Sequence, residues 1–236
     1  MSRRIGARKE RVPYLTDRAI EEHADLLLAE WAAREGGIEI PVPLDDLVEM
    51  HLGIRYAIED LRDELSIPDV LGAIWFSTGK IVVDSSLDPH LNPSMLGRFN
   101  FTLAHEIGHW RLHRQHLRDD PTEAMLFEEN AKPAFVCRSS AKPREEWQAD
   151  TFAGCLLMPR ASVRDAWRNW HGSDDPVAVP DLMPGKCCGS LGDAENAAME
   201  QFCKPFAERF AASAQAMRIR LQALGLLVKE IEPELF

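Results

Sequence analysis

The residues best suited to chemistry lie in one short stretch, where His105 and His109 bracket Glu106 in the pattern H-E-x-x-H. On a helix, four residues advance about 6 Å and complete a little more than one turn, so both imidazoles lie on one face. Two ring nitrogens placed in this way can bind one Zn²⁺ ion at about 2.0–2.1 Å each. Glu106 then lies beside the metal, where it can take a proton from a metal-bound water. The motif therefore predicts hydrolysis by a metal-activated water.

A catalytic zinc site of this kind needs a third protein ligand and leaves the fourth position to water. The longer pattern H-E-x-x-H-x-x-G-x-x-H fails, because Leu112 and Gln115 occupy the positions of its Gly and its third His. His113 lies one turn further along the same helix. Three ligands on consecutive turns of a straight helix do not readily converge on one tetrahedral ion. We therefore interpret His113 as a residue behind the ligands or at the surface.

The better third ligand is Glu146, which follows the motif on a second predicted helix. In thermolysin-like zinc peptidases, the gluzincins, a Glu from a second helix completes the ligand set and a carboxylate one turn later orients the first histidine. Glu146 and Asp150 have this spacing. The alternative is a solvated acidic helix start, in which Glu145 and Glu146 complement the helix dipole. With the motif upstream, we favour Glu146 as ligand, Asp150 as the support of His105, and Glu145 as the fallback ligand.

Two helices must position these residues. The first is predicted over 93–113, capped by Asn92, with an apolar face that recurs at helical spacing and is separate from the histidine face. The second is predicted over 143–158 and ends at Pro159. The motif therefore lies on a helix with a buried side of its own, which is the context that H-E-x-x-H requires.

The remaining chain predicts a mixture of helices and short strands. Residues 70–76 and 80–84 are rich in β-formers and are joined by a short Gly-containing loop, which is typical of a hairpin. We also expect a polar excursion over 115–142, with a short strand at 134–137, that could form a rim beside the substrate. The other predicted elements are helices over 16–34, 44–52, 161–170 and 194–224, a strand over 54–58, and an irregular linker over 171–192.

Size, charge and hydrophobic patterning indicate which partners and which cellular location to expect. The chain has 236 residues, of which 45% are hydrophobic and 28% charged, so it can bury a sizeable core. Its net charge of −11 argues against a broad nucleic-acid-binding surface. No apolar run is long enough for a signal peptide or a membrane span, so we expect no membrane association and a cytoplasmic location. The five cysteines include the vicinal pair Cys187-Cys188 but no C-x-x-C, and we interpret them as reduced, mostly structural thiols.

Two stretches resemble the ImmA/IrrE family of metallo-endopeptidases. Residues 101–109 match its core F-T-x-A-H-E-x-G-H, and residues 146–159 are similar to its second signature, E-x-E-A-[ND]-x-F-A-x-x-L-L-M-P. Residues 220–225 also fit a helix ending in R-L-x-x-L-G that the family often carries. Two departures are Gln148, where an acidic residue is common, and the length of the 115–142 connection, which bears on substrate choice.

The resemblance implies a fold, a metal and a class of substrate. We expect an α+β, zincin-like minimal metalloprotease, with a small β-sheet packed on the active-site helix and additional C-terminal helices. Carried over by position, the family implies Zn²⁺ on His105, His109 and Glu146, with Glu106 as general base; Mn²⁺ is a possible activating metal in vitro. The implied substrates are helix-turn-helix repressors that act in mobile-element induction, stress responses or toxin–antitoxin-like pairs.

The leading hypothesis is therefore a cytoplasmic zinc endopeptidase that cleaves a transcriptional repressor. The alternative is a non-catalytic zincin-fold module that binds a protein, as an antitoxin-like partner does. We divide the chain into an N-terminal helix and tail (1–40), a zincin-like domain (41–170), and a linker with a C-terminal helical region packed on it (171–236). His113 and His171 are both candidates for the oxyanion donor, because the two tyrosines, Tyr14 and Tyr56, lie upstream of the motif.

Overall fold

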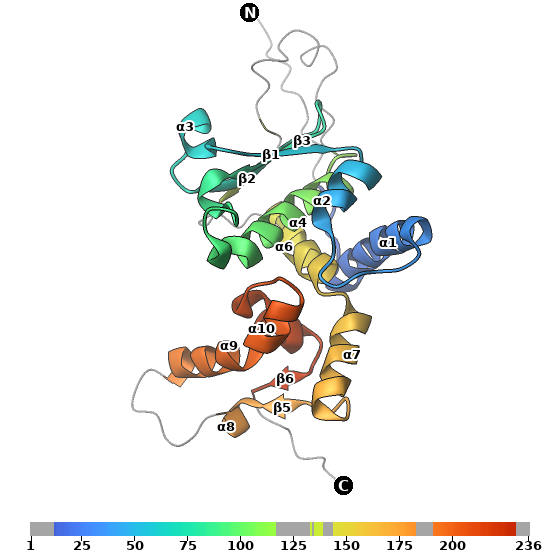
Figure 1. Cartoon of the computed structure of the whole chain (residues 1–236), viewed down its shortest axis with the longest axis vertical. Helices are drawn as coiled ribbons and strands as arrows, with labels where there is room; N and C mark the ends of the chain where they lie inside the picture. The colour runs from blue at the N-terminus through green and yellow to red at the C-terminus, as the bar shows by residue number, and fades with distance from the viewer. Residues whose placement is uncertain (1–11, 117–132, 134, 139–143, 183–190, 230–236) are drawn as a thin grey trace, which may run out of the picture.

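A computed structural model describes residues 12–116, 133, 135–138, 144–182 and 191–229 of the chain. The predicted α+β class is confirmed. Figure 1 shows the sheet in one half of the molecule, with α4 (Leu96–Leu112) and α6 (Arg144–Leu157) beneath it, and the C-terminal helices in the other half. Most of the polar excursion predicted over 115–142, and with it the expected substrate rim, lies outside the described residues, as do Cys187 and Cys188.

The main sheet has four strands in the order β1-β3-β2-β4. Their bounds are Arg55–Glu59 for β1, Val70–Trp75 for β2, Lys80–Asp84 for β3 and Phe135–Arg138 for β4. The predicted hairpin is present, since β2 and β3 pair antiparallel. β1 runs parallel to β3, and β4 pairs antiparallel with the other edge of β2. In this register Gly72 of β2 lies opposite Cys137 of β4, directly above α4.

Helices cover the sheet and form the C-terminal half. The ends of α1 (Asp17–Glu35) illustrate how local sequence sets helix boundaries. The Thr16 side chain accepts a hydrogen bond from Ala19 N at its start, and Gly36 ends it in the left-handed conformation. The helices are α1 (Asp17–Glu35), α2 (Leu44–Asp46), the π-helical turn η1 (Leu47–His51), α3 (Leu61–Leu65), the 3₁₀ turns η2 (Ser85–Leu87) and η3 (Pro93–Met95), α4 (Leu96–Leu112), α6 (Arg144–Leu157), α7 (Arg160–His171), α8 (Val179–Leu182), α9 (Leu191–Arg209) and α10 (Ala214–Ala223).

The C-terminal region differs from the prediction in two ways. The single helix expected over 194–224 is interrupted, because Ala211 adopts a positive φ of 47° and Ser213 starts α10 by accepting a hydrogen bond from Ala216 N. The alanines of this run favour helix by propensity, and tertiary packing overrides that preference. The expected irregular linker over 171–192 contains α8 and the strand β5 (Val177–Ala178), which pairs in parallel with β6 (Leu227–Val228).

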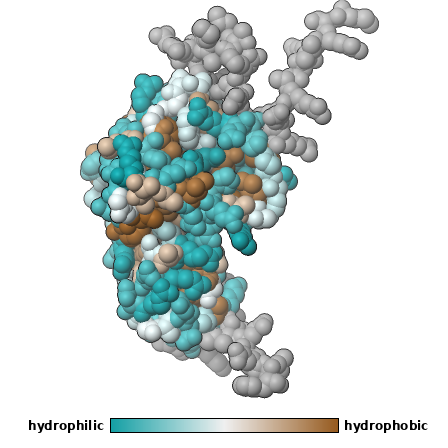
Figure 2. Space-filling view, turned by 90° about the vertical axis from the view of Figure 1, so that its right-hand side faces the viewer, coloured by the Kyte–Doolittle hydropathy of each residue, from teal (hydrophilic) through white to brown (hydrophobic). Residues whose placement is uncertain are grey.

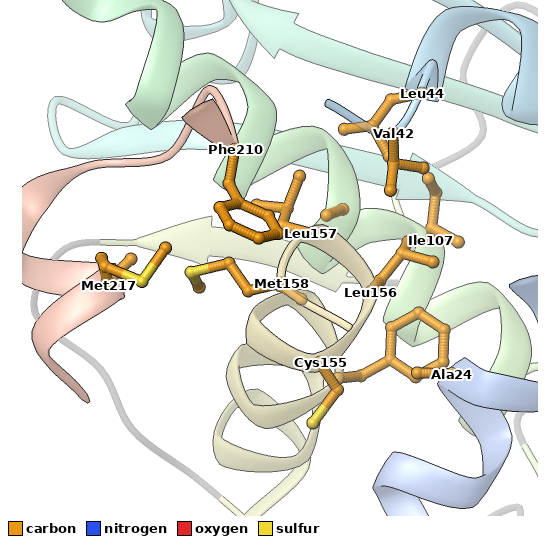
Figure 3. Packing of buried hydrophobic residues seen from close by; sticks show 14 of the residues in the cluster. Ala24, Val42, Leu44, Ile107, Cys155, Leu156, Leu157, Met158, Phe210 and Met217 are labelled. Carbon is orange, nitrogen blue, oxygen red and sulfur yellow. The ribbon is translucent and has the colours of Figure 1, made fainter. Parts of the chain in front are cut away.

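One hydrophobic core joins the two halves, with α6 at its centre. Figure 3 shows Leu156 of α6 near Ile107 of α4, and Met158 near Met217 of α10. Buried Arg220 of α10 donates to the Met158 carbonyl oxygen over 2.9 Å, which ties the start of the R-L-x-x-L-G stretch to the end of α6. The core has members in all three predicted segments, whose boundaries stay a prediction.

The surface carries both polar and apolar patches. Figure 2 shows a largely hydrophilic face with hydrophobic patches near its middle. Within the described residues, no helix is both long enough and apolar enough to cross a membrane.

Candidate metal centre

The site forms where α4 and α6 pack against each other. Gly108 allows this approach, because a Cβ added there would lie 3.2 Å from Ala149 Cα and 3.2 Å from Phe152 Cδ1. The close contact brings the histidine face of α4 next to the first turns of α6. His105, Glu106, His109 and Glu146 are all buried at this junction. For polar groups, such burial is tolerated only when partners or a metal compensate for lost water.

Three donor side chains converge on one point. His105 Nε2 lies 2.9 Å from His109 Nε2 and 3.2 Å from Glu146 Oε2. His109 Nε2 lies 3.4 Å from Glu146 Oε1. Donors on one tetrahedral Zn²⁺, each about 2.0–2.1 Å from the ion, lie roughly 3.3 Å apart. Two imidazoles and a carboxylate with these separations therefore fit a single divalent metal ion.

Asp150 sets the orientation of His105. His105 Nδ1 lies 2.9 Å from Asp150 Oδ1. Since a carboxylate only accepts hydrogen bonds, Nδ1 carries the proton and Nε2 keeps its lone pair on the side of Glu146. This is the carboxylate–histidine arrangement that the spacing of Glu146 and Asp150 predicts.

His109 is oriented by a longer chain of hydrogen bonds. Its Nδ1 lies 2.9 Å from His113 Nδ1, and His113 Nε2 lies 2.9 Å from Gln148 Oε1. Gln148 Nε2 in turn donates to the Pro13 carbonyl oxygen over 2.9 Å. One assignment satisfies every link: His109 Nδ1 donates to His113 Nδ1, and His113 Nε2 donates to Gln148 Oε1. His109 Nε2 then keeps its lone pair for a metal, and His113 lies behind the donors rather than among them.

Glu106 differs from its neighbours in having no partner among the residues that the structure describes. It is wholly buried, and neither carboxylate oxygen has a hydrogen-bond partner among the described residues. Burial raises the pKa of Glu106 to about 8; the charge on His105 lowers it by less than burial raises it, and the negative charge of Glu146 adds a smaller upward effect. A buried carboxyl without partners is costly in a purely structural role. It fits a group that works on a water or substrate beside a metal.

The pKa shifts of Glu146 and His109 suit a ligand set, whereas that of His105 runs the other way and favours the protonated ring when no metal is bound. Burial alone would raise the pKa of Glu146, but hydrogen bonds from His105 and His109 outweigh it and lower the value to about 2. Burial lowers the pKa of His109 to about 3, which keeps this ring neutral, as a metal ligand must be. Burial would also lower the pKa of His105, but its interactions with Asp150, Cys137 and Glu146 raise it well above the usual value.

Two residues of β4 complete the surroundings of the site. The Phe135 ring stacks on the His109 ring with 4.0 Å between centroids and 18° between planes. The sulfur of Cys137, a ring nitrogen of His105 and an oxygen of Glu106 lie within 4.8 Å of one another. Neither Phe135 nor Cys137 is among the site residues predicted from the sequence. The signal available was the strand expected at 134–137, in which Phe135 and Cys137 share one face.

The structure places the other candidates elsewhere. Glu145, the fallback ligand, is half-buried and outside the donor cluster. His171, at the end of α7, stacks on Trp167 and lies 3.0 Å from the Ser173 hydroxyl through Nδ1. His113 has both ring nitrogens engaged in the chain described above. Neither histidine therefore faces the donors as an oxyanion-binding group.

Comparisons with known proteins agree with this geometry at the level of family. The chain matches the family described as IrrE N-terminal-like domain, Peptidase_M78, over residues 90–222, which include α4, β4 and α6. A comparison with curated proteins found no match. One solved structure, described as a Mycobacterium tuberculosis transcriptional regulator, aligns with a TM-score of 0.46 and 15% identity, over 91% of this chain and 58% of that one. This chain thus spans little more than half of that protein, and so distant a likeness carries no argument.

Proposed function

Since this chain belongs to the Peptidase_M78 family of IrrE N-terminal-like domains, we propose that it is a zinc endopeptidase with His105, His109 and Glu146 as metal ligands. The observation that carries the proposal is the convergence of three buried donor side chains beside Glu106, whose carboxyl has no hydrogen-bond partner in the described part of the chain. Each of these four residues comes from α4 or α6, the two helices that the packing at Gly108 brings together.

The chain's own residues divide the chemistry among them. When bound, zinc lowers the pKa of a coordinated water towards about 7 and polarises the scissile carbonyl. Glu106 accepts the proton of the attacking water and passes it to the leaving amine. Asp150 holds His105 in the tautomer that a metal needs, and His113 with Gln148 does the same for His109.

The substrate in this proposal is a protein that binds as an extended segment. β4 is one of the two edge strands of the main sheet as the described residues form it, and it lies against the donor cluster. An outer strand offers main-chain groups to which a peptide can add as a further strand. Phe135 and Cys137 of this strand would then separate the bound segment from the floor of the site.

We further propose that the substrate is a helix-turn-helix transcriptional repressor. This identity rests on the resemblance of residues 101–109 and 146–159 to the ImmA/IrrE signatures. The net charge of −11 favours a protein substrate over direct contact with DNA. A repressor substrate would place the protein in the cytoplasm.

Incubation with the repressor encoded beside this protein tests the proposal. Purified protein loaded with Zn²⁺ or Mn²⁺ should produce one discrete pair of fragments by mass spectrometry, and a chelator should abolish the cut. Glu106→Gln should retain the metal and lose cleavage, whereas Glu145→Gln, one residue from a proposed ligand, should cleave normally. A stable complex without any cut would favour the alternative, a zincin-fold module that binds its partner without hydrolysis.

A further inference from the structure

We propose that Cys137 is a fourth metal ligand in the resting protein and that its sulfur holds the position which water takes in the active enzyme. The inference rests on the proposed metal centre and adds a built-in means of keeping that centre inactive. It arises from the second donor group of the structure, in which His105 is shared with Glu106 and Cys137.

The sheet register directs the Cys137 side chain at the site. Cys137 pairs with Gly72 across β4 and β2, and residues paired across strands project from the same face. Gly72 faces Glu106, because a Cβ added there would lie 2.8 Å from Glu106 Oε1. Phe135, two residues before Cys137 and on the same face, stacks on His109. Both neighbours therefore place the thiol over the metal-binding face of α4.

The thiol lies beside one proposed ligand and the proposed base. Its sulfur, a His105 ring nitrogen and a Glu106 oxygen are within 4.8 Å of one another. Independently, both oxygens of the wholly buried Glu106 lack partners among the described residues. Cys137 shares His105 with the metal-binding group but is not grouped with His109 and Glu146, so the sulfur must move to about 3.6 Å from those donors when it binds the metal. Zn–S bonds are about 2.3 Å, longer than Zn–N bonds, and thiolate is among the preferred ligands of zinc.

The exchange of ligands is balanced and reversible. In the inactive form, Cys137 gives its thiol proton to Glu106 and binds the metal through sulfur, and one water leaves. In the active form, a water returns to the metal, and the sulfur takes back the proton from Glu106. Cys137 belongs to the edge strand β4. A peptide that pairs with β4 would therefore contact the strand that carries the blocking thiol. Alkylation of the thiol would have the same activating effect.

Of the other cysteines, those that the structure describes lie away from the donor cluster. Cys155 is buried and accepts a hydrogen bond from Arg220 Nη1 at 3.3 Å, and Cys203 is buried in the C-terminal half. The pair Cys187-Cys188 is outside the described residues, and its double serine variant is therefore the matched control for adventitious thiol ligands.

Absorption spectra of the Co²⁺-substituted full-length protein test the inference. We expect the visible d–d bands of a low-coordinate Co²⁺ site together with an intense near-ultraviolet thiolate-to-cobalt charge-transfer band. Cys137→Ser should lose the charge-transfer band and keep the d–d bands, whereas the Cys187→Ser/Cys188→Ser control should keep both. If wild-type protein shows d–d bands without the charge-transfer band, Cys137 is not a ligand although the metal centre stands. If Co²⁺ produces no bands at all, the metal centre itself is wrong.

A second measurement covers the case in which Cys137→Ser does not fold. Iodoacetamide labelling of the wild-type protein, mapped by peptide mass spectrometry, reports on the half-buried Cys137 directly. We expect bound Zn²⁺ to suppress labelling of Cys137 relative to the metal-stripped protein, and the metal-stripped protein alkylated at Cys137 to cleave faster once reloaded. Equal labelling with and without Zn²⁺ would overturn the inference.

Discussion

A single methyl group added at Gly72 should disable the base without replacing any proposed site residue. The new Cβ of Gly72→Ala would lie 2.7 Å from Thr102 Cγ2 and 2.8 Å from Glu106 Oε1, both too close for carbon. Thr102 is a buried, β-branched residue on α4 and cannot rotate away easily, so the Glu106 carboxylate must move. Overpacking of this kind costs about 1–3 kcal/mol of folding stability. A displacement of the base by about 1 Å lowers the rate roughly 100-fold.

The assay compares repressor cleavage, bound zinc and urea unfolding for Gly72→Ala and Gly154→Ala. Gly154 is the matched control, because it lies within α6 and a Cβ added there meets nothing within 4 Å. Gly154→Ala should retain full activity and gain about 0.5–1 kcal/mol from helix propensity. Gly72→Ala should keep its zinc, since the ligands do not move, and lose cleavage. Wild-type cleavage by Gly72→Ala would refute the placement of Glu106 under β2.

Three further perturbations have defined outcomes. In metal-stripped protein, the raised Glu106 pKa gives stability that is complete below about pH 4.5 and lost as pH rises to about 8. Above pH 8, the free energy of unfolding of metal-stripped Glu106→Gln, measured with urea, should therefore exceed that of stripped wild type by on the order of a few kcal/mol. In acid the two proteins should have the same free energy of unfolding. His113→Phe leaves His109 Nδ1 without its partner and should weaken zinc affinity by about 10–100-fold in a competition titration with a fluorescent chelator. Gly97→Ala places a Cβ 2.7 Å from the backbone of Ala212 and Ser213, so it should cost about 1–3 kcal/mol in urea unfolding without changing zinc affinity.

The sequence predicted the elements whose cause is local. The helix that carries H-E-x-x-H and the helix that carries Glu146 both have long apolar faces and clear ends, so their positions could be predicted within a few residues. The spacing of Glu146 and Asp150 also predicted which carboxylate would reach His105. Such signals are local, because one turn of helix fixes the relative direction of residues four apart.

The remaining features depend on contacts between distant segments. β5 and β6 have two residues each, too few for any period, and pair only because the chain returns after α10. Gln148 appeared as a departure from a signature, and its role became visible once His113 and the Pro13 carbonyl lay on either side of it. Cys137 lies at the site because β4 pairs with β2 in the register that puts Cys137 opposite Gly72. That register is a contact between distant segments, and the local sequence around Cys137 does not predict it.

Zinc binding by wild-type protein, Glu146→Gln and Glu145→Gln is the most direct test of the metal centre. We predict one tightly bound zinc per chain for wild type and for Glu145→Gln, measured by elemental analysis and competition titration. Glu146→Gln should lose affinity by more than the roughly 10–100-fold typical of an outer-shell partner, because a ligand itself is removed. Equal zinc affinity in Glu146→Gln and wild type would contradict the proposal that α4 and α6 together form the metal centre.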